Sequence, residues 1–420
     1  GDLPHRWGLQ IVREVRGKDE NLVWAPVTRN VSGFLTQVGL LEGMTNLSRS
    51  RNIEVMPTFT AIQFGSLSNQ GQFVDKDPSP EGGVNFKYGI TSNLTADVTY
   101  NPDFSQIESD RPQIEVNERF ALFYPELRPF FLEGAEIFEF EPTAVNFVNT
   151  RTIVDPEFGG KLTGKVGNTT VGLIVANDEA PGNAVGAGTA AFGQTATNVA
   201  ARVRYDLYAE SHVGTIFTHR GFMDGHSTLG GVDGNFRLGR TQLFGFKAVQ
   251  TDHRDLYDVH RQGQMFDLTY RWNSRHWNAF LMAYTLSPNF RTDMGYWRRV
   301  DTKEMLGRIG YTWRPESWVV NWGPSVMSWL GWDFDNIYQD EQNSVNFNAA
   351  FAKNISVNVS YHDEMERYRG INFEKQAVSW GGQINTSRKF SVGGYFRRGE
   401  AVRYEQNPYL GYGGTGNLFV

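Results

Sequence analysis

The dominant pattern along the chain is a strict alternation of apolar and polar positions, which is typical of β-strands. In residues 94–100 the apolar side chains share one face of the predicted strand, and these are Leu94, Ala96, Val98 and Tyr100. Residues 84–90 alternate in the same way, and the short polar segment 91–93 separates the two runs. We therefore predict a β-hairpin over residues 84–100.

Similar alternating runs recur to the end of the chain, about 18 in all, each about 8 to 12 residues long, as expected for tilted strands that cross a membrane. Turns rich in Gly, Asn, Asp and Ser separate the runs. No long stretch has the period of an amphipathic helix, and no internal repeat favours a propeller. The sequence thus predicts an all-β protein, with polar loops expected at 251–263 and 363–374.

The polar face of these runs is often charged, and this distinguishes two architectures. A soluble β-protein would bury the apolar face in a core, whereas a membrane barrel turns that face to lipid and encloses the polar one. The apolar faces include Phe244, Phe246, Phe266 and Leu268, and the charged positions between such residues are Arg202, Arg204, Asp206, Lys247, Asp267 and Arg271. We favour a large antiparallel transmembrane β-barrel of about 16 to 20 strands, and a large soluble β-protein remains the alternative.

Two further features favour a closed barrel. A sheet of this size would expose a long unpaired edge if it were open, and in lipid every unpaired backbone group is costly. Tryptophans also gather near the predicted strand ends, where aromatic girdles meet the membrane interface. These residues are Trp272, Trp277, Trp313, Trp318, Trp329 and Trp332.

Composition narrows the picture only slightly. The 420 residues carry 40 Lys+Arg against 46 Asp+Glu, for a net charge of -6, so nothing predicts a nucleic-acid partner. The chain has no cysteine, which excludes disulfides, thiolate metal sites and a cysteine nucleophile. No apolar run is long enough for a membrane helix, and the first residues lack the pattern of a signal peptide.

Two uncommon strings lie in residues 101–134. The first is "NPDFSQIESD", with Asn101, Pro102, Asp103, Phe104, Gln106, Glu108 and Asp110 at the characteristic positions. The second is "YPELRPFFLEG", with Tyr124, Pro125, Glu126, Arg128, Pro129, Phe130, Phe131, Leu132, Glu133 and Gly134. Together they resemble the hallmark of the DUF5916 family of uncharacterised bacterial proteins.

The resemblance implies a β-barrel domain of unknown function, which in that family usually follows a carbohydrate-binding family-9-like module. No such module lies in these 420 residues. Family members also continue past the equivalent of Val420, so we expect further strands beyond this sequence. The family brings no established activity.

Residues 103–140 fit neither a continuous strand nor a helix, because Pro125 and Pro129 lack donors and interrupt both. We expect this segment to fold into the barrel lumen as a plug or constriction, within one barrel domain spanning residues 1–420. Phe130 and Phe131 would anchor it. Glu126 and Glu133 would pair with arginines, of which the candidates are Arg119 and Arg128. The alternative is an ordinary structured loop outside the barrel.

Chemistry at this segment is open to other interpretations. Its carboxylates could serve glycoside hydrolysis, which needs an acid and a base at a defined separation, but carboxylates near arginines usually form ion pairs. We assign no catalytic residue and expect no cofactor. Calcium is a weaker alternative, with Asp103, Glu108 and Asp110 as candidate ligands, although the EF-hand pattern is missing.

The sequence thus predicts a porin-like protein of a bacterial outer membrane that handles or passes a solute, with carbohydrate as the candidate. Lipid bilayer and lipopolysaccharide are the expected partners. The alternatives are a surface carbohydrate-active enzyme or glycan-binding barrel, and a structural subunit that anchors partner proteins. The lumen and plug candidates are Arg119, Glu126, Arg128, Phe130, Phe131, Glu133, Arg202, Arg204, Asp267 and Arg271.

Overall fold

The fold is known from a computed structural model. It describes residues 4–15, 20–31, 34–45, 52–63, 65–67, 71–75, 77–102, 123–140, 145–315, 317–385 and 391–420.

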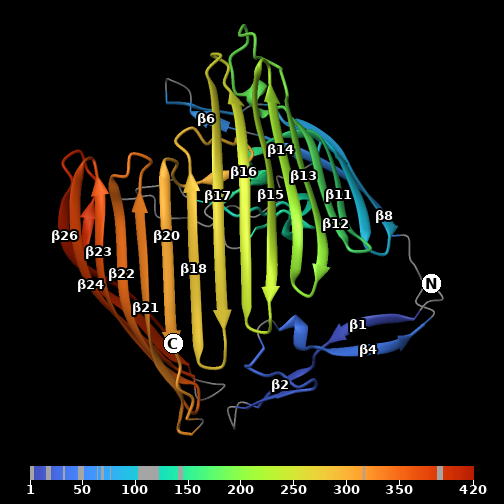
Figure 1. Ribbon diagram of the computed structural model, residues 1–420. Coiled ribbons are helices and arrows are strands. Elements are labelled where there is room, and N and C mark those ends of the chain that lie inside the picture. Colours follow the sequence, from blue (N-terminus) through green and yellow to red (C-terminus); the bar gives the residue numbers. More distant parts are fainter. Residues whose placement is uncertain are drawn as a thin grey trace.

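One long antiparallel sheet dominates the described part of the chain (Figure 1). It has eighteen strands, and their order is that of a closed barrel in which β26 neighbours β5. The strands are β5 (Ile53–Ile62), β8 (Ser79–Thr91), β9 (Leu94–Tyr100), β11 (Pro156–Val166), β12 (Thr169–Asp178), β13 (Ala196–Tyr208), β14 (Ser211–Phe222), β15 (Gly225–Leu238), β16 (Gln242–Arg254), β17 (His260–Asn273), β18 (Trp277–Leu286), β20 (Thr302–Tyr311), β21 (Val319–Trp332), β22 (Tyr338–Phe351), β23 (Ile355–Tyr368), β24 (Ile371–Ile384), β25 (Val392–Arg403) and β26 (Tyr409–Phe419).

The other elements are short. Four two-stranded sheets pair β1 (His5–Leu9) with β4 (Gly39–Met44), β2 (Val12–Val15) with β3 (Glu20–Val23), β6 (Gly65–Leu67) with β7 (Phe73–Asp75), and β10 (Val145–Asn146) with β19 (Tyr296–Trp297). The helical turns are η1 (Leu35–Gln37), α1 (Pro129–Leu132), η2 (Ala135–Ile137), η3 (Thr150–Thr152) and α2 (Ala180–Asn183). Across the described ranges, no helix has the length and hydropathy to cross a membrane. Figure 1 places β1, β2 and β4 at the lower end of the large sheet.

The predicted hairpin over residues 84–100 is confirmed, because β8 and β9 pair antiparallel with Phe86 opposite Val98. One predicted loop is wrong, and another is shorter than predicted. In place of a loop at 363–374, β23 and β24 are joined only through residues 369–370, and the expected loop at 251–263 reduces to residues 255–259. Polar residues at these positions had indicated loops, but the strands continue here with polar side chains on both faces.

The two ends of the sheet differ. At one end the strands are joined by short turns such as residues 167–168 and 209–210. At the other end lie longer connections, residues 101–155, 179–195 and 287–301. The described residues 123–140 and 145–155 of the connection between β9 and β11 cover the face that carries the charged side chains.

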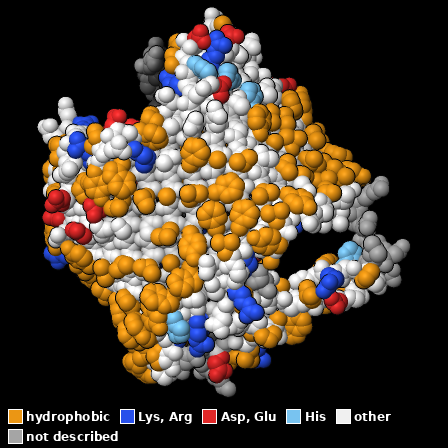
Figure 2. Space-filling model, in the orientation of Figure 1, with side chains coloured by type: hydrophobic (Ala, Val, Ile, Leu, Met, Phe, Trp, Pro, Cys, Tyr) orange, Lys and Arg blue, Asp and Glu red, His pale blue; other side chains and the backbone are white. Residues whose placement is uncertain are grey.

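The two faces of the sheet have inverted burial. Phe266 and Leu268 are 53% and 52% exposed, whereas Asp267 between them is 1% exposed. The same holds on β13, where Val203 is 43% exposed and Arg202 only 3%. Figure 2 shows apolar side chains spread over the middle of the outer wall and charged ones gathered towards the strand ends. A soluble β-sandwich would instead bury its apolar face.

Aromatic side chains cluster on the outer face at the short-turn end, as predicted for most of the tryptophans. Trp272 stacks on Trp277 with centroids 6.2 Å apart, and Trp313 stacks on Trp322 at 4.4 Å. Trp329 does not belong to this cluster, so its prediction as a girdle residue is wrong. Its indole Nε1 donates to Glu304 at 2.8 Å, since both residues lie on the enclosed face.

Candidate functional site

The segment 123–140 packs against the enclosed face of the sheet through charged and apolar contacts. Arg128 donates from Nε to Oε1 of Glu126 at 2.8 Å and from Nη2 to its Oε2 at 2.7 Å. The same guanidinium donates to the carbonyl oxygens of Ile153 at 2.6 Å and Thr150 at 2.8 Å. Arg128 therefore links the two parts of the connection between β9 and β11, residues 123–140 and 145–155.

Glu126 is ionised within this contact. Burial alone would raise the pKa of its carboxyl, but hydrogen bonds from Arg128 and from Thr150 outweigh burial and lower the pKa to about 2. The Thr150 hydroxyl donates to Oε2 at 2.7 Å, so both carboxylate oxygens are engaged. The predicted pairing of Glu126 with an arginine is thus present in the structure.

Lys161, which points from β11 into the enclosed space, holds the short helix α1. Its Nζ donates to the carbonyl oxygens of Phe130 at 2.7 Å and Glu133 at 2.9 Å, and lies 3.2 Å from Asp97. The side chain of Glu133 does not pair with an arginine as predicted, because Lys87 donates to both of its oxygens at 2.5 and 2.7 Å. Two lysines, from β8 and β11 on either side of β9, therefore fix this turn.

Phe131 and Phe138 anchor the segment in an apolar cluster on the wall. Phe131 is 2% exposed and Phe138 is 4% exposed. Phe130 packs beside that cluster and meets Phe131 edge-on with centroids 5.0 Å apart. Gly134 makes the sharp turn between α1 and η2 in the left-handed region, with φ of 75°.

A second apolar cluster lies at the middle of strands β14–β18, where residues 145–148 and the loop 287–301 cover the wall. Its buried members are Val145, Phe147, Ile216, Leu229, Val249, Met265, Leu286 and Phe290. These contacts exclude water from this part of the enclosed face.

Charged wall residues form pairs beside these clusters. Arg202 holds Asp233 bidentately, with one bond of 2.8 Å, and lies 4.1 Å from the ring of Phe140. Lys247 donates to Asp267 at 2.8 Å. Buried ion pairs of this kind require a partner for each charge, since an isolated buried charge is very costly.

A polar cavity of about 300 Å³ lies between residues 136–140 and the wall strands β13–β17. It brings together three of the predicted wall residues, Arg202, Arg204 and Arg271, and adds Glu136 and Glu139 from the covering segment. Asp267 does not line the cavity, but its partner Lys247 does. This cavity is the candidate functional site.

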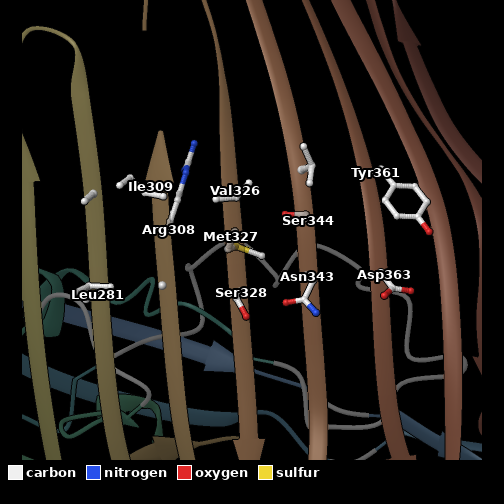
Figure 3. Close-up of a pocket in the computed structure, with 13 residues that line it drawn as sticks. Leu281, Arg308, Ile309, Val326, Met327, Ser328, Asn343, Ser344, Tyr361 and Asp363 are labelled. Atoms are coloured by element: carbon white, nitrogen blue, oxygen red, sulfur yellow. The ribbon is translucent and has the colours of Figure 1, made fainter. Parts of the chain in front are cut away.

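A larger hollow of about 590 Å³ lies on the opposite, outer face across β18 and β20–β23 (Figure 3). Its walls are apolar side chains such as Ile309, Val326 and Tyr361, on neighbouring strands. Figure 3 shows Ser328, Asn343 and Asp363 in a neighbouring row across three strands. The hollow holds no convergent set of charges, so it does not qualify as the site of polar chemistry.

Several predicted residues lie outside the described part of the chain. They are Asp103, Phe104, Gln106, Glu108, Asp110 and Arg119. Asn101 is described, and its side-chain amide donates to the carbonyl oxygen of Gly82 at 3.1 Å, which ties the end of β9 to β8. Among the residues that the structure describes, no group of three His, Asp or Glu side chains could hold a metal ion.

Sequence reasoning missed Lys161 and Glu139. Lys161 lies on the polar face of an alternating strand between Gly160 and Leu162, so the alternation would have assigned it to the enclosed wall. Glu139 has no comparable signal, because its segment is irregular and only the packing of Phe138 directs it to the cavity.

Together these features define an all-β protein with an apolar outer wall and a charged enclosed face that is partly covered by its own chain. Residues 58–141 match the model of the family described as a domain of unknown function, DUF5916, which supports the resemblance found in residues 101–134. No curated protein matches the chain. The crystal structure of Acinetobacter baumannii OccAB3 is similar, with 10% identity over 83% of this chain and 92% of that chain and a TM-score of 0.33.

Proposed function

We propose that this protein is a transmembrane β-barrel of a bacterial outer membrane that passes a solute through a partly plugged lumen. The observation that carries the proposal is the inverted burial of the wall. Apolar residues such as Phe266 and Leu268 are exposed, and charged residues such as Asp267 and Lys247 are buried. Only an apolar surrounding makes this arrangement favourable, because exposed apolar area in water costs about 25 cal/mol per Å².

The even number of strands and the difference between the two ends support the same proposal. Outer-membrane barrels have short periplasmic turns and longer extracellular loops. The end with turns 167–168 and 209–210 would then face the periplasm, and residues 123–140 and 145–155 would enter the lumen from the cell surface. The exposed apolar wall would contact the lipid bilayer, including lipopolysaccharide in its outer leaflet.

The covering segment supports a plug or constriction rather than a catalytic centre. Glu126 is held by Arg128 and Thr150, and Glu133 is held by Lys87. An acid and base for glycoside hydrolysis must exchange protons with substrate, which these engaged carboxylates are poorly placed to do. A carbohydrate solute is an expectation that rests on the family resemblance alone.

Ion conductance in planar bilayers tests the proposal. The wild-type chain is expected to give discrete conductance steps, and a variant that lacks residues 117–138 is expected to give larger ones, because the lumen then loses its cover. A variant that lacks residues 405–407, between β25 and β26, serves as a control that should conduct like the wild type. If the wild type and the variant without residues 117–138 insert in the bilayer and neither conducts, the proposal is wrong.

A further inference from the structure

The cavity between residues 136–140 and the wall holds unpaired charges of both signs. Asp233 neutralises Arg202, and Asp267 neutralises Lys247. Arg271, by contrast, makes only a contact of 5.8 Å with the ring of Phe280, and no ion pair in the described part of the chain includes it. Its guanidinium therefore keeps donors for a ligand.

Arg204 adds a second set of donors on the same wall. Its ion pair with Asp206 is long, at 3.5 Å, and Asp206 is also paired with Lys165. The atom that faces Asp206 is Nε of Arg204, which is buried and makes no hydrogen bond within the part of the chain that the structure describes. A buried donor without a partner is costly, so an acceptor placed in the cavity would be bound favourably.

The opposite side of the cavity is acidic. Glu136, which lies in η2, and Glu139, which lies two residues after η2, line this side. Both residues are exposed. Within the described ranges neither carboxylate takes part in an ion pair, although Arg204 and Arg271 line the same space. The packing of Phe138 on the wall fixes this acidic side, so the opposite charges are held apart.

The cavity has a volume of about 300 Å³, and its positive and negative side chains lie on different sides. Such a cavity complements a small molecule that carries one positive and one negative group. We infer that the cavity binds a small zwitterionic solute with the chemistry of a free α-amino acid. The carboxylate of the solute accepts from Arg271 and Arg204, and its ammonium donates to Glu139 and Glu136. This inference deepens the proposed function and rests on it for the passage of that solute, although binding can be measured on its own.

Isothermal titration calorimetry on the detergent-solubilised full chain tests the inference with L-glutamine as the probe. N-acetyl-L-glutamine lacks the ammonium group, L-glutaminamide lacks the carboxylate, and glucose lacks both charges. L-glutamine is expected to bind, each singly charged analogue about tenfold more weakly because one charge-assisted contact is lost, and glucose not at all.

The variants Arg271→Gln and Glu139→Gln are each expected to weaken L-glutamine binding about tenfold. Arg271→Lys should retain part of the binding, which separates loss of charge from misfolding. Arg298→Gln and Asp224→Asn, at exposed positions on connecting segments, are matched controls that should bind like the wild type.

The outcomes separate this inference from the proposed function. Equal binding of L-glutamine and N-acetyl-L-glutamine, or binding of glucose in preference, would overturn the zwitterion site. Absence of L-glutamine binding to a protein that conducts ions would also overturn it. Binding of L-glutamine with the expected pattern by a protein that never conducts would support the site and contradict only the proposed passage.

Discussion

The ring of Phe138 occupies the space where Gly172 would carry a side chain. A Cβ atom at Gly172 would lie 2.7 Å from Cζ of Phe138 and 2.8 Å from Cγ2 of Ile137. The enclosed face of β12 is therefore smooth at this point, and the covering segment approaches the backbone of the wall directly.

The variant Gly172→Leu is expected to displace residues 135–140 from the wall. Overpacking of this kind costs about 1–3 kcal/mol, and the conductance steps should become larger because the cover is loosened. Gly160→Leu on the neighbouring strand is the control, since a Cβ there meets no atom within 4 Å. Single-channel recordings and thermal unfolding of both variants check the prediction, and equal behaviour of the two would contradict it.

Alternation alone was sufficient to predict the wall of this fold. It assigned Phe266 and Leu268 to one face and Asp267 to the other, and these side chains are exposed and buried respectively. Period-two patterning is a local property, so each strand can be read without knowledge of its neighbours. The turns at 255–259 and 369–370 were harder to place. Near these turns the strands carry polar residues on both faces, so the alternation of apolar and polar positions stops before the strand ends.

The covering segment could be placed only in outline, and its role as a plug stays a prediction. Its position depends on contacts between residues far apart in sequence, such as Nζ of Lys161 with the carbonyl oxygen of Phe130 at 2.7 Å. Prolines 125 and 129 excluded regular structure there, but they do not indicate which wall residue the segment meets. The pairing of Glu133 with Lys87 in place of an arginine arises in the same way.

Acid should loosen the contact made by Glu126. Its pKa in the folded protein is about 2, below the ordinary value of 4.5, so folding favours the ionised form. The stabilisation is fully present above pH 4.5 and is lost as the pH falls through about 2. The difference between the two pKa values corresponds to about 3 kcal/mol of folding free energy.

Conductance recorded from pH 7 to pH 2 measures this effect. We expect constant steps down to about pH 4.5 and larger steps below it. Glu126→Gln should give larger steps already at pH 7, whereas Glu405→Gln, with its exposed side chain, should follow the wild type. A Glu126→Gln variant that keeps the wild-type profile would rule out this role of Glu126.

Loss of one partner of the buried ion pair on the wall should be severe. Arg202 and Asp233 are 3% and 7% exposed as side chains, so Asp233→Asn leaves a buried charge uncompensated and should cost about 3–5 kcal/mol. The exposed pair of Arg254 and Asp258 is the comparison, and Asp258→Asn should cost less than about 1 kcal/mol. Urea unfolding of the reconstituted protein measures both, and similar losses for the two would be inconsistent with a buried pair.

On the outer face of β23, the destabilisation caused by an introduced arginine should depend on its depth in the membrane. Val359 and Asp363 point to the same side of the strand, and the row of Asp363 is polar whereas that of Val359 is apolar. If lipid covers Val359, Val359→Arg should destabilise the barrel by about 2–4 kcal/mol and Asp363→Arg by only about 0–1 kcal/mol. Unfolding from lipid vesicles measures the two, and equal costs would place both residues in water.

The most direct test of the central claim uses the absence of cysteine from this chain. Single cysteines at Ser344, Val345, Asn346 and Phe347 on β22 can each carry a nitroxide label in protein reconstituted in lipid vesicles. Val345 and Phe347 are 55% and 44% exposed, whereas Ser344 is 6% exposed. The account predicts that labels at Val345 and Phe347 are relaxed by oxygen dissolved in lipid and labels at Ser344 and Asn346 by a water-soluble nickel chelate. The account would be contradicted if the nickel chelate relaxed the labels at all four positions. It would also be contradicted if oxygen relaxed the labels at Ser344 and Asn346 and nickel those at Val345 and Phe347.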